Sequence, residues 1–534
     1  MQTSTDRKNI SFNSRIVHLA IVAIAILAIL TIGYRDQIHF LLFDRSPAPK
    51  IVVYDAISDD AFYYMEIAKN IIAGLGSTFD EITQTNGYHP LWMLILVILG
   101  LVVKVDSLDF AVILLLLVNL FLVLGTYVFH RLQGEILGRK DQFYTAAIIF
   151  YFAALFIARS GMEVCLLFLV IPLFLLQLIR IERRPSLPAF VALGFLASIL
   201  VLSRLDAVLF AAVVLSLYAG MILSSREKLP TPKQLGAFAM GGVLFPIYLL
   251  YNLLNFDHVM PISGRVKALH FSGLFFSQRG WESLVEAITT EPYLLAFFLL
   301  TIAGLGILSV QIWKRFTIKE VVLLAPLIYP VLFFAYYLLS SDWPFWLWYF
   351  YPLAVSSSFG YIFIENQMLG ASPFLSRLYR HSTTVLAIGL LLLAGMKFST
   401  IPDRFVPNPI LEAATWVQEF SSEHPGIYAM GDRAGAVSIL LDEPLIQLEG
   451  LVADNELVNS IQEHRDLLDV LNDYSVDYYI ATNPEYRAGC WEFQEPQISG
   501  TSAPRMRGSL CEDPVFTFVA TLDDVTTMIF KISP

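Results

Sequence analysis

The sequence is poor in charge and in cysteine, and it lacks the short motifs of several large enzyme classes. Only 15% of its 534 residues are charged, and three are cysteine, too few for a disulfide framework or a cysteine-based zinc site. The chain has no GxxxxGK(S/T) phosphate loop, HExxH helix, dinucleotide-binding GxGxxG or GxSxG elbow. ATP-driven transport, zinc proteolysis and α/β-hydrolase chemistry therefore lack their usual signatures, and no nucleotide cofactor is expected.

Hydrophobic runs dominate the first 400 residues. The chain is 56% hydrophobic, with a mean hydropathy of +0.63, and a membrane-crossing helix needs about 20 such residues. The net charge of −11 gives no sign of nucleic-acid binding, because the basic residues form short clusters between apolar runs, such as Arg180–Arg184. Arg7, Lys8 and Arg15 precede the run 16–34, which has no cleavage site at its end, and this favours a first transmembrane helix over a signal peptide.

We predict a mainly α, polytopic membrane protein with about eleven spans, in the cell's inner or plasma membrane. Basic loops on one side place the N-terminus in the cytoplasm and the C-terminus outside. Leu91–Val103 is apolar but too short to cross comfortably, so we expect it to lie in the outer interface. The predicted spans are roughly 16–34, 110–129, 142–158, 164–180, 188–203, 206–222, 236–254, 293–312, 321–340, 346–364 and 384–400.

The composition changes near residue 400, which divides the chain into a membrane domain, 1–400, and an extracytoplasmic domain, 401–534. Pro407 and Pro409 interrupt the apolar pattern and charges become frequent. Cys490 and Cys511 both fall in the second domain, where a disulfide or two free thiols are both possible. Short runs predict a mixed α/β fold: a helix at Ile410–Phe420 and strands at Gly426–Met430, Pro444–Leu448, Val476–Ala481, Val515–Ala520 and Thr526–Ile532.

The first outer loop, 35–90, carries the most concentrated polarity. Ser58 is a good N-cap for a helix from Asp59 to Ala73, which Gly74 would end. Asp59 and Asp60 then occupy its first turn, where carboxylates also complement the helix dipole. The polar residues that follow favour more than this, because paired carboxylates suit proton abstraction or metal binding.

Further polar groups stand at other outer junctions. Glu163 is a candidate active-site acid, and Arg204 and Asp206 are either functional at membrane depth or simply paired with each other. Arg265 and Lys267 suit a phosphate group, or else extend toward lipid headgroups. The candidate ligand-binding residues of the first loop are Tyr63, Asn86, Tyr88 and His89.

These motifs resemble the GT-C class of membrane glycosyltransferases, which use polyprenyl-phosphate-linked sugars as donors. The segments DDAFYY…IAGLGSTFD…TNGYHPLW, SGMEV, LSRLDAVL, PISGRVK and WYFYP are similar to a branch related to arabinofuranosyltransferases, protein mannosyltransferases and lipid A aminoarabinose transferases. The likeness covers about residues 10–400, and DRAGAV…IQLEGLV (432–452) also resembles the outer domain common in this branch. The arabinofuranosyltransferases usually carry a sequence like EGYTN where this chain has TNGYHP. The resemblance therefore does not imply that the sugar handled by this protein is arabinofuranose.

The resemblance implies sugar transfer, with inversion, to a glycan, glycolipid or protein acceptor on the outer face. One carboxylate of the pair would act as general base, with Asp59 favoured, and Arg265 and Lys267 would hold the donor phosphate. It also admits a divalent cation, Mg²⁺ or Mn²⁺, held by Asp60 and Glu163. The alternatives are a transporter or flippase of lipid-linked sugars and a non-catalytic protein whose outer domain binds glycan.

Overall fold

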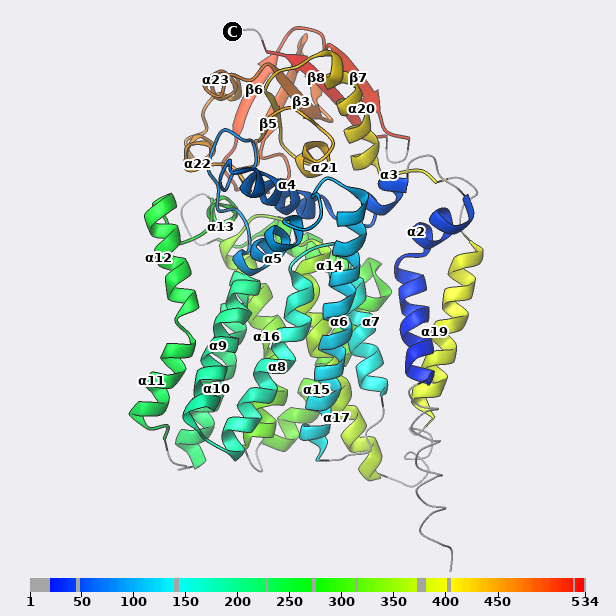
Figure 1. The fold of residues 1–534 in the computed structure, drawn as a ribbon, viewed down its shortest axis with the longest axis vertical. Helices are drawn as coiled ribbons and strands as arrows, with labels where there is room; N and C mark the ends of the chain where they lie inside the picture. Colours follow the sequence, from blue (N-terminus) through cyan, green and yellow to red (C-terminus); the bar gives the residue numbers. More distant parts are fainter. Residues whose placement is uncertain are drawn as a thin grey trace, which may run out of the picture.

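The chain folds into a bundle of long helices that carries a smaller α/β domain at one end (Figure 1). The computed structural model describes residues 20–44, 49–138, 144–225, 229–270, 275–312, 316–371, 381–400, 405–521 and 524–532. The N-terminal Arg7, Lys8 and Arg15 lie outside these residues. Between the bundle and the domain lies a layer of short elements that includes α4 (Asp59–Ala73) and α13 (Ile262–Lys267).

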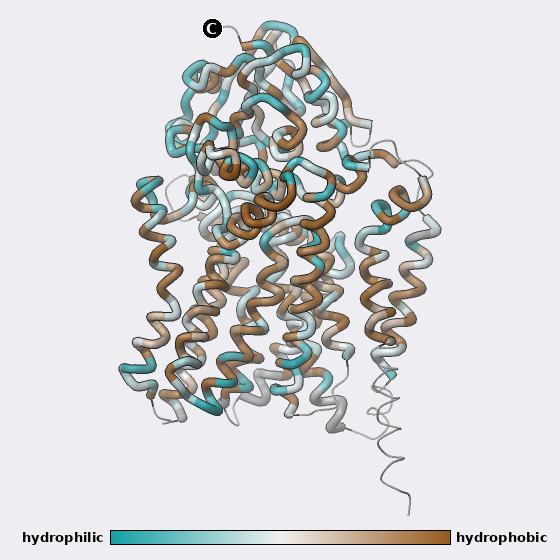
Figure 2. Tube along the Cα trace, viewed as in Figure 1, coloured by the Kyte–Doolittle hydropathy of each residue, from teal (hydrophilic) through white to brown (hydrophobic). Residues whose placement is uncertain are grey.

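The apolar helices make this a multi-pass membrane protein, as predicted. Five helical segments of the described residues are long and apolar enough to cross a bilayer, and three pairs of helices bent by more than 40° pass the same test together. Figure 2 shows their apolar residues as a band along the bundle. The predicted number of eleven spans stays a prediction. The single spans are α6 (Leu108–Leu137), α8 (Val164–Arg183), Leu205–Ser224 with η2 (Leu205–Ala207) and α10 (Val208–Ser225), α16 (Ile318–Ser340), and Leu347–Glu365 with η3 (Leu347–Phe350) and α17 (Tyr351–Ala371).

The bent pairs and shorter helices complete the bundle. The bent pairs are Ala20–Gly33 with Arg35–Phe43, which contains α2 (Arg35–His39), α11 (Pro232–Gly241) with α12 (Leu244–Phe256), and α14 (Gln278–Thr290) with α15 (Pro292–Ile312). The shorter elements are η1 (Phe40–Asp44), α3 (Pro49–Tyr54), α5 (Pro90–Gly100), α7 (Thr145–Ala158), α9 (Leu187–Ser203) and α19 (Ser382–Ser399).

The segment expected at the membrane interface forms α5. Its 11 residues rise only about 16 Å as a helix, roughly half the thickness of the hydrocarbon core. Figure 1 places α5 beside α4 at the end of the bundle below the C-terminal domain. The indole of Trp92 is fully buried and donates to the carbonyl of Gly161 at 3.1 Å. This bond ties α5 to the turn that precedes α8.

Glycines let several helix pairs approach closely. A Cβ at Gly360 of α17 would lie 2.2 Å from the Leu300 carbonyl oxygen of α15, and one at Gly125 of α6 would lie 2.4 Å from the Phe168 carbonyl oxygen of α8. Close backbone contact of this kind is how small residues stabilise helix pairs in membranes, where dispersion replaces the hydrophobic effect.

The C-terminal domain is a mixed α/β fold, as predicted. Its larger sheet has the order β2-β1-β3-β8-β7, with β2 (Leu445–Gln447), β1 (Tyr428–Met430) and β3 (Tyr478–Thr482) parallel, and β8 (Thr526–Lys531) and β7 (Phe516–Val519) antiparallel. These strands match the five predicted runs. The helices are α20 (Pro409–Glu423), α21 (Ala434–Ser438), α22 (Asn455–Gln462) and α23 (Leu467–Asp473).

A second sheet was not predicted. It contains β4 (Glu485–Arg487), β5 (Cys490–Glu495) and β6 (Met506–Leu510) in antiparallel order. Its strands are rich in charged and polar residues and partly exposed, so their hydrophobic signal is weak. Cys490 and Cys511 form a disulfide in this sheet, which decides between the two possibilities that the sequence left open.

Gly360→Ala should destabilise the bundle, because the added methyl group has to push α15 away from α17. We expect a loss of about 1–3 kcal/mol, typical of overpacking, measured as a lower melting temperature of the detergent-solubilised protein. Gly389→Ala in α19 is the matched control, since nothing lies within 4 Å of its added Cβ. Equal melting temperatures for the two variants would contradict the close contact.

Candidate active site

The helix that carries the acidic pair forms as the sequence predicts. Helix α4 runs from Asp59 to Ala73, and Gly74 ends it with a left-handed φ of 83°. Ser58 occupies the N-cap with extended backbone geometry, but its side chain makes no capping bond, and its hydroxyl donates to the carbonyl of Ser160 at 3.3 Å instead. The Ser58 amide donates to the carbonyl of Ser160 at 3.0 Å. This bond fixes the start of α4 against the turn between α7 and α8, so both aspartates are held at the end of the membrane bundle.

The two aspartates have different surroundings. Asp59 accepts hydrogen bonds from the backbone amides of Ala436, at 2.7 Å, and Gly435, at 3.3 Å, one on each carboxylate oxygen. Burial raises the pKa of Asp59 to about 7, and Asp60 adds to the shift while the two amides oppose it. Asp59 therefore connects α4 to the start of α21 in the C-terminal domain.

Asp60 accepts no hydrogen bond from any residue that the structure describes. Burial raises the pKa of its carboxyl to about 6, opposed by Lys267 and Arg204 and reinforced by Glu163 and Asp432. Its oxygens are thus available to a ligand, whereas those of Asp59 are occupied. A carboxyl that titrates near neutral pH can exchange a proton during a reaction.

Two glycines bring the C-terminal domain against the first outer loop. A Cβ at Gly435 would lie 2.2 Å from the carbonyl oxygen of Asp59, and one at Gly87 would lie 2.0 Å from the carbonyl oxygen of Leu451. Only glycine permits such backbone approach. The segments 432–437 and 447–452 of the C-terminal domain therefore form part of the same site as the loop.

A buried chain of charges lies on the membrane side of Asp60. Arg204 donates from Nη1 to Glu163 at 2.6 Å and from Nε to Asp206 at 2.9 Å. Asp206 also accepts from Tyr337 at 2.8 Å and from Tyr351 at 3.0 Å. Arg204 and Asp206 are thus paired, and Glu163, which is fully buried, joins them. Such mutual pairing offsets the cost of placing these charges away from water.

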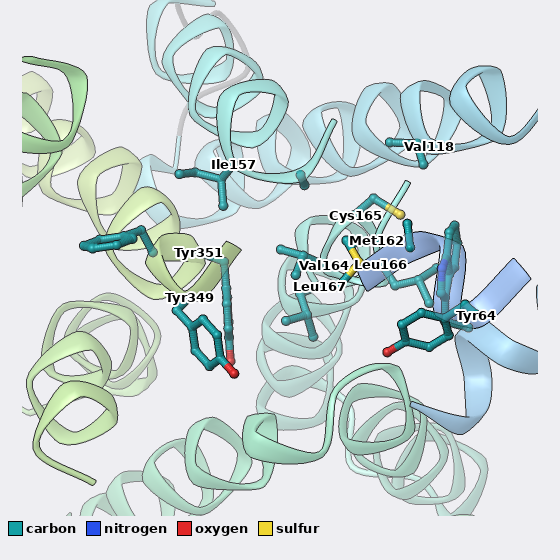
Figure 3. Close-up of a cluster of buried hydrophobic side chains, with 14 of the residues drawn as sticks. Tyr64, Val118, Ile157, Met162, Val164, Cys165, Leu166, Leu167, Tyr349 and Tyr351 are labelled. Atoms are coloured by element: carbon teal, nitrogen blue, oxygen red, sulfur yellow. The ribbon is translucent and has the colours of Figure 1, made fainter. Parts of the chain in front are cut away.

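Apolar packing holds this charged chain in place. Figure 3 shows Met162 and the first turn of α8, Val164–Leu167, between Tyr64 on one side and Tyr349 and Tyr351 on the other. Tyr64 donates to Glu163 at 3.2 Å, and the guanidinium of Arg204 lies 4.8 Å from the centre of the Tyr349 ring. The aromatic rings therefore contact the charged groups as well as the core.

The two cations of α13 point to different partners. Lys267 donates to the hydroxyl of Tyr349 at 3.0 Å and lies 5.6 Å from the ring centre of Trp343. Burial alone would lower the pKa of Lys267, but Tyr349 and Asp60 raise it, so the ammonium stays charged. Arg265 instead donates to Asn455 and Asn459 of α22. The structure thus separates the pair that was expected to act together on a phosphate.

The loop residues serve partly to shape the site. Tyr63 is buried, with its ring edge against Phe79, and Asn86 accepts from the amide of Ile262 at 2.9 Å. Tyr88 bonds Ser77 through its hydroxyl at 2.8 Å.

His89 lies against the charged chain and stays neutral. Its Nδ1 accepts from the amide of Leu205 at 3.3 Å, and its Nε2 lies 3.6 Å from Glu163. Burial, with the charge of Arg204 adding to it, lowers the pKa of His89 to about 3. A neutral imidazole here links the first loop to η2 and adds no positive charge beside Arg204.

Two cavities meet at Asp60 and Lys267, which line both of them. The larger, of about 380 Å³, lies between α4, the Trp343–Trp348 segment and the C-terminal domain. The smaller, of about 60 Å³, lies on the side of Glu163, Arg204 and His89. A group in either cavity can reach Asp60, so this carboxylate stands between two possible ligands.

The divalent cation expected at Asp60 and Glu163 stays a prediction. Within the part of the chain that the structure describes, no group of three or more His, Cys, Asp or Glu side chains is arranged to hold a metal ion. Both oxygens of Glu163 accept hydrogen bonds, from Arg204 and Tyr64.

Several residues of the site were not among the predicted site residues. Asp432 and Glu449 line the larger cavity from the C-terminal domain, and Trp346 and Trp348 line it from the segment before α17. The sequence predicts the run of residues 346–351 mainly as a membrane-interface belt and only secondarily as a wall for substrate. The segments DRAGAV and IQLEGLV were predicted only to belong to the C-terminal domain of this branch. They were not predicted to line the site, because nothing in the sequence places residues 432–452 beside residue 60.

Comparison with known proteins supports the fold. No protein-family model and no curated protein sequence matches the chain. The crystal structure of ArnT from Cupriavidus metallidurans bound to undecaprenyl phosphate is similar over 96% of this chain and 97% of its own, with a TM-score of 0.52 and 13% sequence identity. The apo structure of that ArnT covers 79% of this chain and 87% of its own, with a TM-score of 0.49 and 15% identity. The first of these likenesses spans nearly the whole of both chains, so the predicted GT-C-like fold, that of a membrane helix bundle with a C-terminal α/β domain, is confirmed.

Proposed function

We propose that this protein is a membrane glycosyltransferase that moves a sugar from a polyprenyl-phosphate donor to an acceptor hydroxyl on the extracytoplasmic face. The observation that carries the proposal is the position of Asp60, a carboxylate with unoccupied oxygens where two cavities meet beside the cation of Lys267. The similar structure of ArnT contains undecaprenyl phosphate, which supports a polyprenyl phosphate as the lipid partner. The acceptor is a glycan, a glycolipid or a protein.

Asp60 would act as the general base, in place of the Asp59 favoured from the sequence. Its carboxylate takes the proton of the acceptor hydroxyl, whose oxygen then attacks the anomeric carbon of the donor. The bond from that carbon to the phosphate oxygen breaks, its electron pair stays on the phosphate, and polyprenyl phosphate leaves. Attack from the face opposite the phosphate inverts the anomeric centre.

Lys267 and Arg204 would hold the donor phosphate. Both cations line the smaller cavity, and the ammonium of Lys267 stabilises the negative charge that grows on the leaving phosphate. Glu163 and Asp206 hold Arg204 in position through their ion pairs. The donor is already activated by its phosphate, so the reaction needs no nucleotide.

A transporter of lipid-linked sugars would place ionisable residues near the middle of the membrane, with inverted repeats and broken helices around them. The charged groups of this site instead lie with α4 at the end of the bundle nearest the C-terminal domain (Figure 1). This position suits a reaction at the membrane surface.

Asp60→Asn should lower sugar transfer by about 10²–10⁴-fold, the usual contribution of a general base. Asp59→Asn should lower it by less than about tenfold, because the amide oxygen can still accept from Gly435 or Ala436. Transfer is measured in membranes offered radiolabelled polyprenyl-phosphate pentoses and hexoses. Full transfer by the Asp60→Asn variant would contradict the proposal that Asp60 is the general base.

The transfer rate should rise with pH through about 6 and then level off, because only the deprotonated carboxyl of Asp60 can accept a proton. The transfer rate is measured at saturating donor at a series of pH values from about 4.5 to about 8. A rate independent of pH over this range would show that no carboxyl with a raised pKa acts as the base.

Lys267→Met should lower kcat/KM for the donor by about 10²-fold or more, the scale seen when a charge-stabilising donor is removed. Arg265→Met is the matched control in the same short helix, since its guanidinium faces Asn455 and Asn459 instead of the cavities. We expect it to retain donor kinetics within about threefold. Equal losses in the two variants would contradict the separation of roles in α13.

A further inference from the structure

The larger cavity is lined by two chemically different kinds of side chain. Asp432 and Glu449 of the C-terminal domain supply carboxyl groups, and Trp346 and Trp348 supply aromatic rings. Its volume of about 380 Å³ is at the lower end of the range for small-molecule sites. The cavity is therefore large enough for one or two sugar rings, and it offers them both polar and apolar contacts.

Glu449, which lines this cavity, has an unused hydrogen-bonding group. Its side chain is only 3% exposed, Oε2 accepts from Gln447 at 3.3 Å, and Oε1 has no partner among the described residues. A buried polar atom without a partner is costly. Burial, with Asp432 adding to it, raises the pKa of Glu449 well above its usual range, so the protonated carboxyl can donate to an oxygen as well as accept.

The two tryptophans offer a flat apolar surface. The rings of Trp346 and Trp348 stack with their centres 6.0 Å apart and their planes at 19°, and Trp346 is 39% exposed. A sugar ring has one face of C–H groups and an edge of hydroxyls. Aromatic faces bury the former and carboxyls hydrogen-bond the latter, so the two kinds of lining group suit the two sides of a sugar.

We propose that this cavity is the acceptor subsite and that it takes the terminal ring of an uncharged glycan or glycolipid. Glu449 would hydrogen-bond the ring hydroxyls, with the apolar face of the sugar against Trp346 and Trp348. This inference rests on the proposed transferase function and specifies its acceptor class. The acceptor hydroxyl reaches Asp60 from the side of the C-terminal domain, while the donor phosphate occupies the side of Arg204.

The charges of the cavity largely offset one another. Arg433 forms an ion pair with Asp432 at 3.2 Å, and Lys267 offsets the charge of Asp60, so the cavity attracts an ion of neither sign strongly and suits a neutral ligand. The C-terminal domain thus acquires a direct part in acceptor recognition. Gly435 and Gly87 permit this by allowing its two segments to contact the first outer loop.

The test is direct binding, without donor, to the purified full-length protein in nanodiscs. Saturation-transfer difference NMR is recorded with methyl α-mannopyranoside, methyl β-galactopyranoside, methyl α-arabinofuranoside and a serine-containing tripeptide as probes. We expect at least one glycoside to bind saturably, and Glu449→Leu and Trp346→Leu each to weaken that binding by about five- to tenfold.

Two matched variants serve as controls. Glu443 also accepts one hydrogen bond at 3.3 Å but lines a different cavity, and Trp416, in α20, is 41% exposed. Glu443→Leu and Trp416→Leu should bind as the wild type does. Removing a buried carboxyl that has one oxygen without a partner and one long hydrogen bond should leave the melting temperature of Glu449→Leu equal or higher, which separates lost binding from lost folding.

Three results would overturn the inference: no glycoside binds the wild type, Glu449→Leu binds as tightly as the wild type, or the tripeptide binds while the glycosides do not. Because the assay contains no donor, these results are independent of sugar transfer. A failure of the transferase proposal would instead be seen as full transfer by the Asp60→Asn variant.

Discussion

The contact between the carboxylate of Asp59 and the amides of Gly435 and Ala436 determines how the two parts of the molecule meet. These bonds connect residues 376 and 377 positions apart in the chain, and they occupy the first acid of the pair. The neighbouring carboxylate is consequently left to face the cavities. This interaction thus joins the C-terminal domain to α4 and gives two adjacent aspartates different surroundings.

A second constraint comes from the buried charges on the membrane side. Arg204 joins Glu163, at the start of α8, to Asp206, and Asp206 is bonded in turn by tyrosines of α16 and α17. Removing Arg204 would leave the buried Glu163 and Asp206 without the cation that they share, which is strongly destabilising. These ion pairs therefore fix the ends of these helices nearest the C-terminal domain relative to one another. They also keep the guanidinium of Arg204 beside the smaller cavity.

Much of this architecture could be predicted from local sequence signals. Apolar runs predicted the membrane helices, and Ser58 and Gly74 predicted where α4 begins and ends. The prediction that α5 lies in the membrane interface followed from its length and from the position of the basic loops, and it stays a prediction. Strands β4 to β6 were missed because their residues are largely polar.

The different roles of neighbouring residues in the site could not be predicted from local sequence signals. Asp59 and Asp60 are indistinguishable in sequence, as are Arg265 and Lys267 in their charge, and only long-range contacts separate them. Glu449 and Asp432 reach the cavity through the folding of a domain some 370 residues further along the chain. No local pattern encodes that proximity, because close backbone approach at Gly87 and Gly435 depends on the partner segment as much as on the glycine.

In the proposed mechanism, donor and acceptor approach Asp60 from opposite sides, and a structure of the complex with a polyprenyl-phosphate sugar is the most direct test. We expect the donor phosphate to lie within hydrogen-bonding distance of the ammonium of Lys267. The free face of the anomeric carbon should then point toward Asp60 and the cavity lined by Glu449. A phosphate bound elsewhere, for instance beside Arg35 and Arg159 in the cavity near α2, would contradict it.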